Sequence, residues 1–293
     1  MRNGTRHQYS PKTIKRVHQI ISSSLNTAVQ WQLIKENPCQ RAKPPKEKKQ
    51  VDVKHFTLEQ AQAFLDQLDK PYKVAYKGRN KKDGTESNKH YEIRTFPLQY
   101  KVLFYLAIFG GFRRGELVAL TWDDIDFNSR TVTINKTSAR TKNGIITKSP
   151  KTFSSNRDVV VGIEVIEPLK KYKVEQNKYR LTLGSYWQGE NYIFIQDNGK
   201  QMDISTPNKV FQKVIKVHNA TCEDKLPEFT LHGLRHTSAT LLIAQNIDVK
   251  TVSVRLGHSE TSTTMDIYAH ALKKQDEKAS DSLSQLFQKK ALC

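Results

Sequence analysis

Residues 98–120 read LQYKVLFYLAIFGGFRRGELVAL, a strongly apolar stretch whose composition predicts buried helix. Gly110-Gly111 interrupts this helix, because a glycine pair is conformationally permissive and weakens helical structure. Arg113 follows the glycines and Glu116 comes three positions later, so the two side chains share one helical face. The stretch therefore predicts helical structure broken at a glycine pair, with an Arg–Glu pair just after the break.

A small β-region follows this stretch. Residues 131–134 are all β-branched, Asn143-Gly144 is a hairpin turn signal, and residues 158–161 form a third short strand by pattern. The chain from Glu164 onward is mainly helical by pattern, with a helix expected over residues 233–244. The polar stretch between Tyr76 and His90 is expected to be an exposed loop. The predicted fold class is mainly α with a small antiparallel β-sheet.

The N-terminal region predicts a separate helical piece. Ser10-Pro11 is a helix start, and apolar residues recur at helical spacing from there to about Val29. The stretch KPPKEKK over residues 43–49 has no apolar periodicity, and its prolines and repelling lysines favour an extended linker. The predicted organisation is a partial helical domain over residues 1–42, a basic linker over 43–55 and a larger mixed domain over 56–293.

Composition indicates the class of partner. The 293 residues include 48 Lys and Arg against 29 Asp and Glu, a formal net charge of +19, which favours binding to nucleic acid. No apolar stretch approaches the length of a membrane span and no signal-peptide core follows Met1, so a soluble, intracellular protein is expected. Cys39, Cys222 and Cys293 lie far apart and outside any metal-ligand spacing, which predicts neither disulfides nor a zinc site.

Several segments carry residues suited to phosphoryl transfer. Such a reaction needs a nucleophile, a proton acceptor, a donor for the leaving oxygen, and fixed donors for the charge on the phosphate. Arginine suits the last role because its planar fork can donate two hydrogen bonds to a phosphate. His232 and Arg235 lie one helical turn apart, so both can face one ligand.

Each of these segments is weak when taken alone. An Arg-x-x-Glu pair is usually a surface salt bridge, and Arg114 has the same chemistry as Arg113. A late tyrosine usually serves packing, and the chain contains 11 tyrosines. Residue chemistry by itself therefore indicates a basic, DNA-binding protein with candidate phosphoryl-transfer residues.

The segments in their order along the chain resemble the tyrosine recombinase family, in particular the integrases of phages and conjugative elements. The family pattern is Gly-x-Arg-x-Gly-Glu-Leu with a following Trp-x-Asp-Ile, a hairpin lysine, His-x-x-Arg, Leu-Gly-His and a late tyrosine. The matching positions are Arg113 to Leu117, Trp122 to Ile125, Lys151, His232 to Arg235, Leu256 to His258, and Tyr268. The match covers about residues 56–272, and it selects Arg113 over Arg114.

The resemblance implies a metal-independent DNA strand transferase that needs no cofactor. It assigns six catalytic residues: Arg113, Lys151, His232, Arg235, His258 and Tyr268. The two arginines would clamp the scissile phosphate, the lysine would protonate the leaving 5′ oxygen, and the tyrosine would form a 3′-phosphotyrosyl link. Glu116 would support the site by orienting a neighbouring side chain, and Trp122 would belong to the core.

The resemblance also implies how the chain meets double-stranded DNA at a specific crossover site. Residues 10–38 are similar to the second half of the family's core-binding domain. The side chains expected to contact DNA in this region and in the linker after it are Lys12, Lys15, Arg16, Lys43, Lys46, Lys48 and Lys49. The family's arm-type domain and first core-binding helices are expected to be missing, which would weaken independent DNA binding.

The tail after Tyr268 could form an amphipathic helix that joins subunits into a tetramer on DNA, as in the family, or that packs on its own domain. Accessory DNA-bending or excision factors and a place at the bacterial nucleoid in the cytoplasm are implied as well. Three alternatives remain: a catalytically impaired, DNA-binding integrase remnant, a helical transcription factor, and a type IB topoisomerase. The complete Arg, Lys, His and Tyr set speaks against a transcription factor, and the Leu-Gly-His segment favours a recombinase over a topoisomerase.

Overall fold

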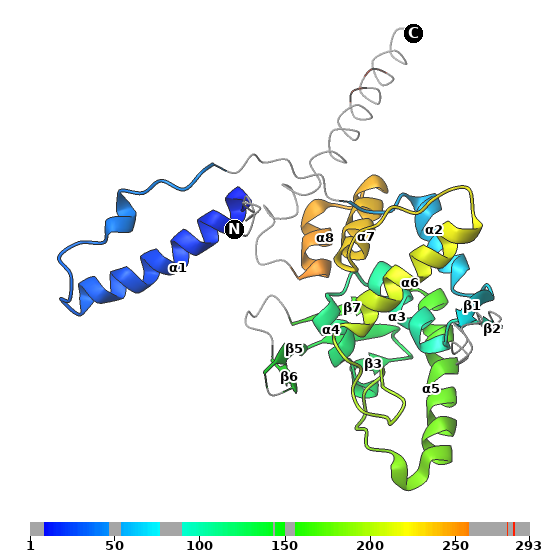
Figure 1. The fold of residues 1–293 in the computed structure, drawn as a ribbon. Helices are drawn as coiled ribbons and strands as arrows, with labels where there is room; N and C mark the ends of the chain where they lie inside the picture. The colour runs from blue at the N-terminus through cyan, green and yellow to red at the C-terminus, as the bar shows by residue number, and fades with distance from the viewer. Residues whose placement is uncertain are drawn as a thin grey trace, which may run out of the picture. The chain divides into compact units, whose positions relative to one another are not determined.

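A computed structural model of the chain describes residues 9–46, 54–76, 90–142, 144–149 and 156–257, together with Ser280 and Ser284. Five residues with an expected role therefore lie outside the described residues: Lys48, Lys49, Lys151, His258 and Tyr268. The amphipathic tail lies there too. The chain divides into two compact units, Met1–Asp52 and Val53–Cys293, and each is considered by itself (Figure 1).

The described part of the first unit contains α1 (Pro11–Gln30) and the 3-10 turn η1 (Pro38–Gln40). The side chain of Ser10 caps α1, as its position before a proline predicts. After the helix the chain turns back, and the buried amide of Asn37 donates to the carbonyl oxygen of Ser22 and to Oδ1 of Asn26. No residue of α1 itself is buried, so the apolar stripe expected along this helix lies on the surface of the unit.

The described part of the second unit is built mostly from helices. They are α2 (Leu58–Gln67), α3 (Leu98–Phe109), α4 (Arg114–Ala119), α5 (Ile163–Leu183), α6 (Thr206–Thr221), α7 (His232–Ala244) and α8 (Val249–Leu256), with the 3-10 turns η2 (Trp122–Asp124) and η4 (Gly184–Tyr186). The predicted break at Gly110-Gly111 separates α3 from α4, and the helix expected over 233–244 is α7. The mainly helical class is confirmed. No helix in the described part of the chain is long and apolar enough to cross a membrane.

The strands of the second unit are short and antiparallel. They are β1 (Tyr72–Tyr76), β2 (His90–Arg94), β3 (Ile125–Asp126), β4 (Thr131–Ile134), β5 (Thr137–Thr141), β6 (Gly144–Lys148) and β7 (Arg157–Val160). They form a three-stranded sheet in the order β3-β4-β7 and two hairpins, β1-β2 and β5-β6. The β5–β6 hairpin has the turn predicted at Asn143-Gly144, with Thr141 paired to Gly144, although Asn143 itself lies outside the described residues.

The sequence predicted one small sheet, whereas the described residues contain three. The β1–β2 pair was missed because its strands border the polar stretch that was expected to be a loop. β1 shows no regular alternation of polar and apolar residues, and β2 alternates over only five positions, with its apolar Ile93 and Tyr91 exposed. Strands of that length are stabilised by pairing with each other, and local sequence patterns do not report such pairing.

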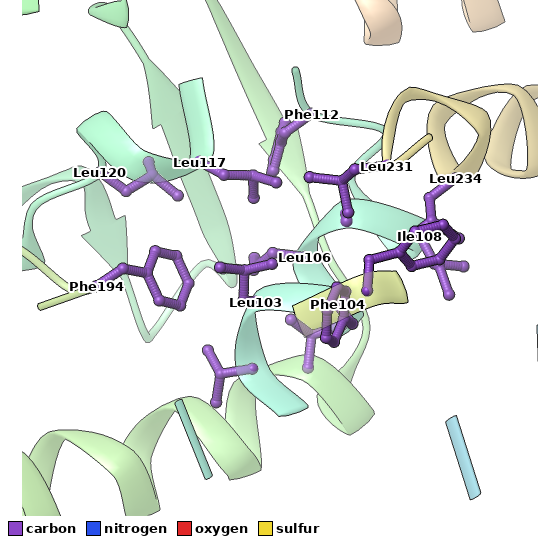
Figure 2. Close-up of a cluster of buried hydrophobic side chains, with 14 of the residues drawn as sticks. Leu103, Phe104, Leu106, Ile108, Phe112, Leu117, Leu120, Phe194, Leu231 and Leu234 are labelled. Carbon is purple, nitrogen blue, oxygen red and sulfur yellow. The ribbon is translucent and has the colours of Figure 1, made fainter. Parts of the chain in front are cut away.

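The core of the second unit is centred on α3, whose residues 102–104 and 106–108 are buried. Figure 2 shows Leu103, Leu106 and their neighbours on α3 directed toward Leu117 and Leu120 at the other side of the glycine break, and toward Leu231 and Leu234 at the start of α7. The core therefore holds α4 and α7 against α3 by buried apolar contact. Trp122 is buried and its indole nitrogen donates to Gln176, as expected for a core residue.

Candidate active site

The site begins at the turn between α3 and α4. Gly111 has φ +64°, and a Cβ at this position would lie 2.5 Å from Cδ2 of Leu256, so the turn requires glycine for its backbone and for its close contact with α8. The next side chain, Phe112, is buried in the core. Because Phe112 points inward, Arg113 at the N-terminal end of α4 points away from the core.

Arg113 and Arg114, which have the same chemistry, differ in their surroundings. Arg113 has a side chain that is 37% exposed, and its Nη1 donates to Oε1 of Glu116 at 2.8 Å. Its Nη2 donates to the carbonyl oxygen of Gly257 at 2.7 Å. Among the described residues these bonds use two of the five guanidinium N–H groups. Arg114 is exposed on the first turn of α4.

Glu116 is the buried anion of this site, with a side chain that is only 4% exposed. Its carboxylate accepts hydrogen bonds from the backbone and the guanidinium of Arg113, and also from Nη2 of Arg157 at 2.8 Å. Burial alone would raise the pKa of Glu116, but the hydrogen bonds and charge of Arg157, together with the bonds from Arg113, lower it. The ionised carboxylate therefore holds two arginines.

Arg157 is a residue of this site to which sequence reasoning gave no role. It is the first residue of β7, and its side chain is only 5% exposed. The available signal was an arginine at the start of a predicted strand, behind Lys151. Such an arginine is usually a surface residue, and only its pairing with Glu116 from another element shows that it is buried.

The first turn of α7 contributes His232 and Arg235. Arg235 is buried, and its Nη1 donates to the carbonyl oxygen of Gly111 at 2.9 Å, which ties α7 to the turn that carries Arg113. His232 keeps an exposed face, yet surrounding protein atoms, the charge of Arg235 and the charge of Arg113 lower its pKa, in that order. The two guanidinium groups therefore act on the same imidazole.

A second histidine, which the sequence analysis did not single out, lies behind the first. The ring of His236 meets that of His232 edge to face, with the ring centres 4.8 Å apart. Burial, followed by the influence of His232, Arg235 and His55, lowers the pKa of His236 to about 4. His236 is therefore neutral near neutral pH and packs against His232 as an uncharged ring.

The end of α8 completes the described part of the site. Gly257 has φ +68° and ψ +48°, the left-handed conformation that often ends a helix, and its carbonyl oxygen accepts the bond from Arg113. A Cβ at Gly257 would lie 2.8 Å from Nη1 of Arg157. The chain thus leaves α8 between Arg113 and Arg157, and the next residue in the sequence is His258.

The structure accordingly brings together Arg113, Glu116, His232 and Arg235 from two helices. Lys151, His258 and Tyr268 lie outside the described residues. In the first unit, the expected DNA-contacting side chains that are described are exposed: Lys12, Lys15, Arg16, Lys43 and Lys46. Within the described residues no group of three or more histidine, cysteine, aspartate or glutamate side chains could hold a metal ion.

Comparisons with known proteins show which family and which proteins this chain is similar to. The phage integrase family matches residues 83–275. A XerC-like tyrosine recombinase of Caldanaerobacter subterraneus subsp. tengcongensis is 30% identical over 295 residues, covering 95% of this chain and 67% of that protein. The ICEBs1 integrase of Bacillus subtilis strain 168 is 26% identical over 280 residues, covering 94% of this chain and 66% of the integrase. The chain thus spans about two thirds of the length of these two relatives.

The fold has solved counterparts as well. The integrase of the Tn1549 transposon, in complex with circular intermediate DNA, superimposes with a TM-score of 0.65 at 21% identity, covering 92% of this chain and 81% of that one. At this level of identity the likeness concerns the fold. The ordered arginine, histidine and glycine segments are gathered at one site, and the family match and the curated relative cover most of the chain. The chain therefore belongs to the tyrosine recombinases of the phage integrase family.

Proposed function

We propose that this chain is the DNA-cutting and rejoining part of a site-specific recombinase, an integrase that inserts or excises a mobile element. The observation that carries the proposal is the convergence of two guanidinium groups and an imidazole from different helices. Arg113 is held by Glu116 and Gly257, and Arg235 is held by Gly111. The recombinase and the integrase among the relatives support the same activity.

In the proposed reaction, the arginines bind the phosphate that is cleaved. Arg113 and Arg235 donate hydrogen bonds to its non-bridging oxygens and offset the charge that develops there. The burial of Arg235 strengthens this effect, because a fixed donor inside the protein is poorly screened by water. The charge of the phosphate is thereby carried by side chains, and the reaction needs no metal ion.

The proton transfers use the remaining residues. Tyr268 Oη attacks phosphorus while its proton passes to His232, whose lowered pKa keeps the imidazole neutral near neutral pH and able to accept it. The bond from phosphorus to the 5′ oxygen breaks, and Lys151 protonates that oxygen. His258 donates to a phosphate oxygen. The 3′-phosphotyrosyl link keeps the energy of the diester, so a 5′ hydroxyl can attack it and rejoin the strand without ATP.

The DNA partner of this reaction is a duplex with a specific crossover site. The solved Tn1549 integrase carries DNA, which supports a DNA partner for this chain. We place the exposed basic side chains of the first unit on the phosphate backbone of that duplex. Assembly into a tetramer through the tail after Tyr268, help from accessory DNA-bending factors, and action in the bacterial cytoplasm complete the proposal.

The proposal is tested with a nicked duplex that carries the crossover site of the element and traps the covalent intermediate. Wild-type protein should give a protein–DNA adduct that survives SDS on a denaturing gel, and Tyr268→Phe should give none. Tyr186→Phe is the matched control, because Tyr186 is an exposed tyrosine of η4 outside the site, and it should form the adduct as wild type does.

Each other outcome has a definite meaning. Wild-type protein that binds this DNA and forms no adduct would contradict the enzymatic proposal and favour an impaired, DNA-binding remnant. An adduct that persists in Tyr268→Phe would show that another residue is the nucleophile. Relaxation of supercoiled plasmids without any site preference would indicate a topoisomerase.

A further inference from the structure

Arg157 makes contacts that reach beyond its own strand. At one end of the β4–β7 ladder, the backbone of Arg157 pairs with Ile134 of β4. Its side chain enters the interior, where Nη2 donates to Oε2 of Glu116 at 2.8 Å and Nη1 lies 3.3 Å from Oε1. Its Nε donates to the carbonyl oxygen of Arg255, the next to last residue of α8, at 2.7 Å. One planar group thus joins β7, α4 and α8.

The same guanidinium is enclosed by the segments that border it. Its central carbon lies 5.8 Å from the ring centre of Phe112, the residue just before Arg113. On another side it lies so close to Gly257 that a Cβ there would come within 2.8 Å of Nη1. Arg157 therefore contacts the chain directly next to Arg113 and directly before His258.

The charges around Arg157 explain why its position is well defined. Glu116 is its anionic partner, and Arg113 competes for the same carboxylate. Arg255 adds a further, half-buried cation, whose Nη2 donates to the carbonyl oxygen of Phe109 at 2.8 Å. A buried guanidinium is costly unless its hydrogen bonds are well formed. The fork of Arg157 is therefore held in the orientation in which it donates both to the carboxylate of Glu116 and to the carbonyl oxygen of Arg255.

Arg157 also limits how Glu116 can hold Arg113. With both Oε atoms of Glu116 engaged by Arg157, the carboxylate is held in one orientation. In that orientation the backbone N–H of Arg113 donates to Oε2, and the guanidinium of Arg113 donates to Oε1 through Nη1 alone. Without Arg157, the carboxylate could rotate to accept two parallel hydrogen bonds from the guanidinium of Arg113. Those bonds would turn Arg113 away from the carbonyl oxygen of Gly257 and from a bound phosphate.

We propose that Arg157 is a positioning residue for DNA strand cleavage. By bridging Glu116 and the end of α8, it sets the orientation of Arg113 and the point at which the chain continues toward His258. This inference rests on the proposed recombinase function and adds a residue to it. The side chain of Arg157 is only 5% exposed, so it acts through its neighbours.

The inference predicts a slower reaction with unchanged DNA binding. In Arg157→Met the rate of adduct formation at saturating DNA should fall by about tenfold to a hundredfold, the effect of a misplacement near 1 Å in an active site. The dissociation constant for the same duplex should stay near its wild-type value. Arg157→Lys should recover part of the rate, because lysine can pair with Glu116 but cannot also donate to Arg255 from a fixed fork.

Lys136→Met is the matched control for reduced stability. Lys136 also forms a largely buried ion pair in this unit, with Asp124 at 2.7 Å, and it contacts neither Arg113 nor Arg157 among the described residues. Thermal unfolding of all variants sets a common assay temperature at which each protein is folded. At that temperature Lys136→Met should cleave at the wild-type rate even where its melting temperature has fallen as far as that of Arg157→Met.

The outcomes separate this inference from the proposed function. If wild type forms the adduct and Arg157→Met forms it equally fast, the positioning role is wrong and the recombinase function stands. The same holds if Lys136→Met slows cleavage as much as Arg157→Met, since the role of Arg157 is then only structural. If Arg157→Met fails to fold, Arg157→Lys decides, and a full wild-type rate there overturns the role. If wild type forms no adduct, both proposals fall.

Discussion

Individual side chains of the site differ in ways that only their partners reveal. Arg113 and Arg114 are adjacent and chemically identical, yet one is held between Glu116 and Gly257 while the other is exposed. The cause is the neighbouring Phe112, whose burial in the core fixes the direction in which the chain enters α4. Two adjacent, chemically equal side chains thus differ in their partners because one apolar ring beside them is buried.

Glu116 leads to a prediction about pH. Its pKa is lowered in the folded protein, so its ionised form stabilises the fold fully above the unfolded value of 4.5 and loses that effect as the pH falls through the folded pKa. Glu116→Gln resembles the protonated state. It should lower the free energy of unfolding by roughly 3 kcal/mol near neutral pH, the cost of breaking a buried pair, and by progressively less below pH 4.5.

Urea unfolding of wild type and Glu116→Gln over a series of pH values measures this difference. Glu167→Gln is the control, because Glu167 forms an exposed pair with Lys170 and should show a small effect at every pH. A Glu116→Gln difference that stays constant as the pH is lowered would contradict the account of Glu116.

At the scale of elements, the positions of the short helices depend on the residues at their ends. α4 has six residues and α8 has eight, so neither is long enough to be stable by itself. α4 is joined to the core through Leu117 and Val118, and α8 through Val252 and Leu256 to the second, smaller core cluster with α7. The close approach of α8 to the turn before α4 then depends on Gly111, where a Cβ would meet Leu256, and its approach to Arg157 of β7 depends on Gly257.

Gly257 should therefore be sensitive to substitution in activity as well as in stability. Gly257→Ala forces alanine into the left-handed region, at a cost of about 1 kcal/mol, and pushes a methyl group against Arg157. Gly184→Ala is the control, since Gly184 also has a positive φ but no atom within 4 Å of an added Cβ. Both variants should be less stable in thermal unfolding, and only Gly257→Ala should form the DNA adduct more slowly. Equal rates for the two variants would show that the contact with Arg157 has no part in cleavage.

At the scale of the whole molecule, charge is distributed unevenly along the chain. Residues 1–50 contain eleven lysine and arginine residues against two acidic ones, out of a net charge of +19 for the whole chain. In α1, no residue is buried, and its basic side chains are exposed to solvent. A segment of this kind can bind a polyanion by releasing its counterions, an effect that weakens as salt is added.

The salt dependence of DNA binding tests this use of α1. Changing Lys12, Lys15 and Arg16 together to glutamine should weaken binding and reduce the slope of log K against log salt by about 0.9 for each phosphate that is no longer neutralised. Changing Lys170, Lys171 and Lys178 to glutamine removes the same charge from exposed positions of another helix, α5, and is the control. Equal changes of slope in the two triple variants would mean that net charge, and no specific contact by α1, determines the affinity.

Much of the local structure could be predicted because its causes are local. The cap of α1 at Ser10, the capping box of α2 at Thr57 and Gln60, and the break at Gly110-Gly111 each depend on residues within a few positions of one another. The order of the motifs was also sufficient to indicate the family that the comparisons show. The β1–β2 hairpin was missed because its pairing joins strands separated by a long polar stretch.

The sequence by itself determined which residue types are present for phosphoryl transfer, the glycine break between α3 and α4, and the helix α7 that carries His232 and Arg235. Only the tertiary structure decided how those residues are paired. Glu116 takes Arg157 as its partner across 41 positions, and Arg113 takes the carbonyl oxygen of Gly257 across 144. Such contacts are set by how the core packs α3, α4, α7 and α8 together, because the burial that creates them involves side chains far apart in the chain.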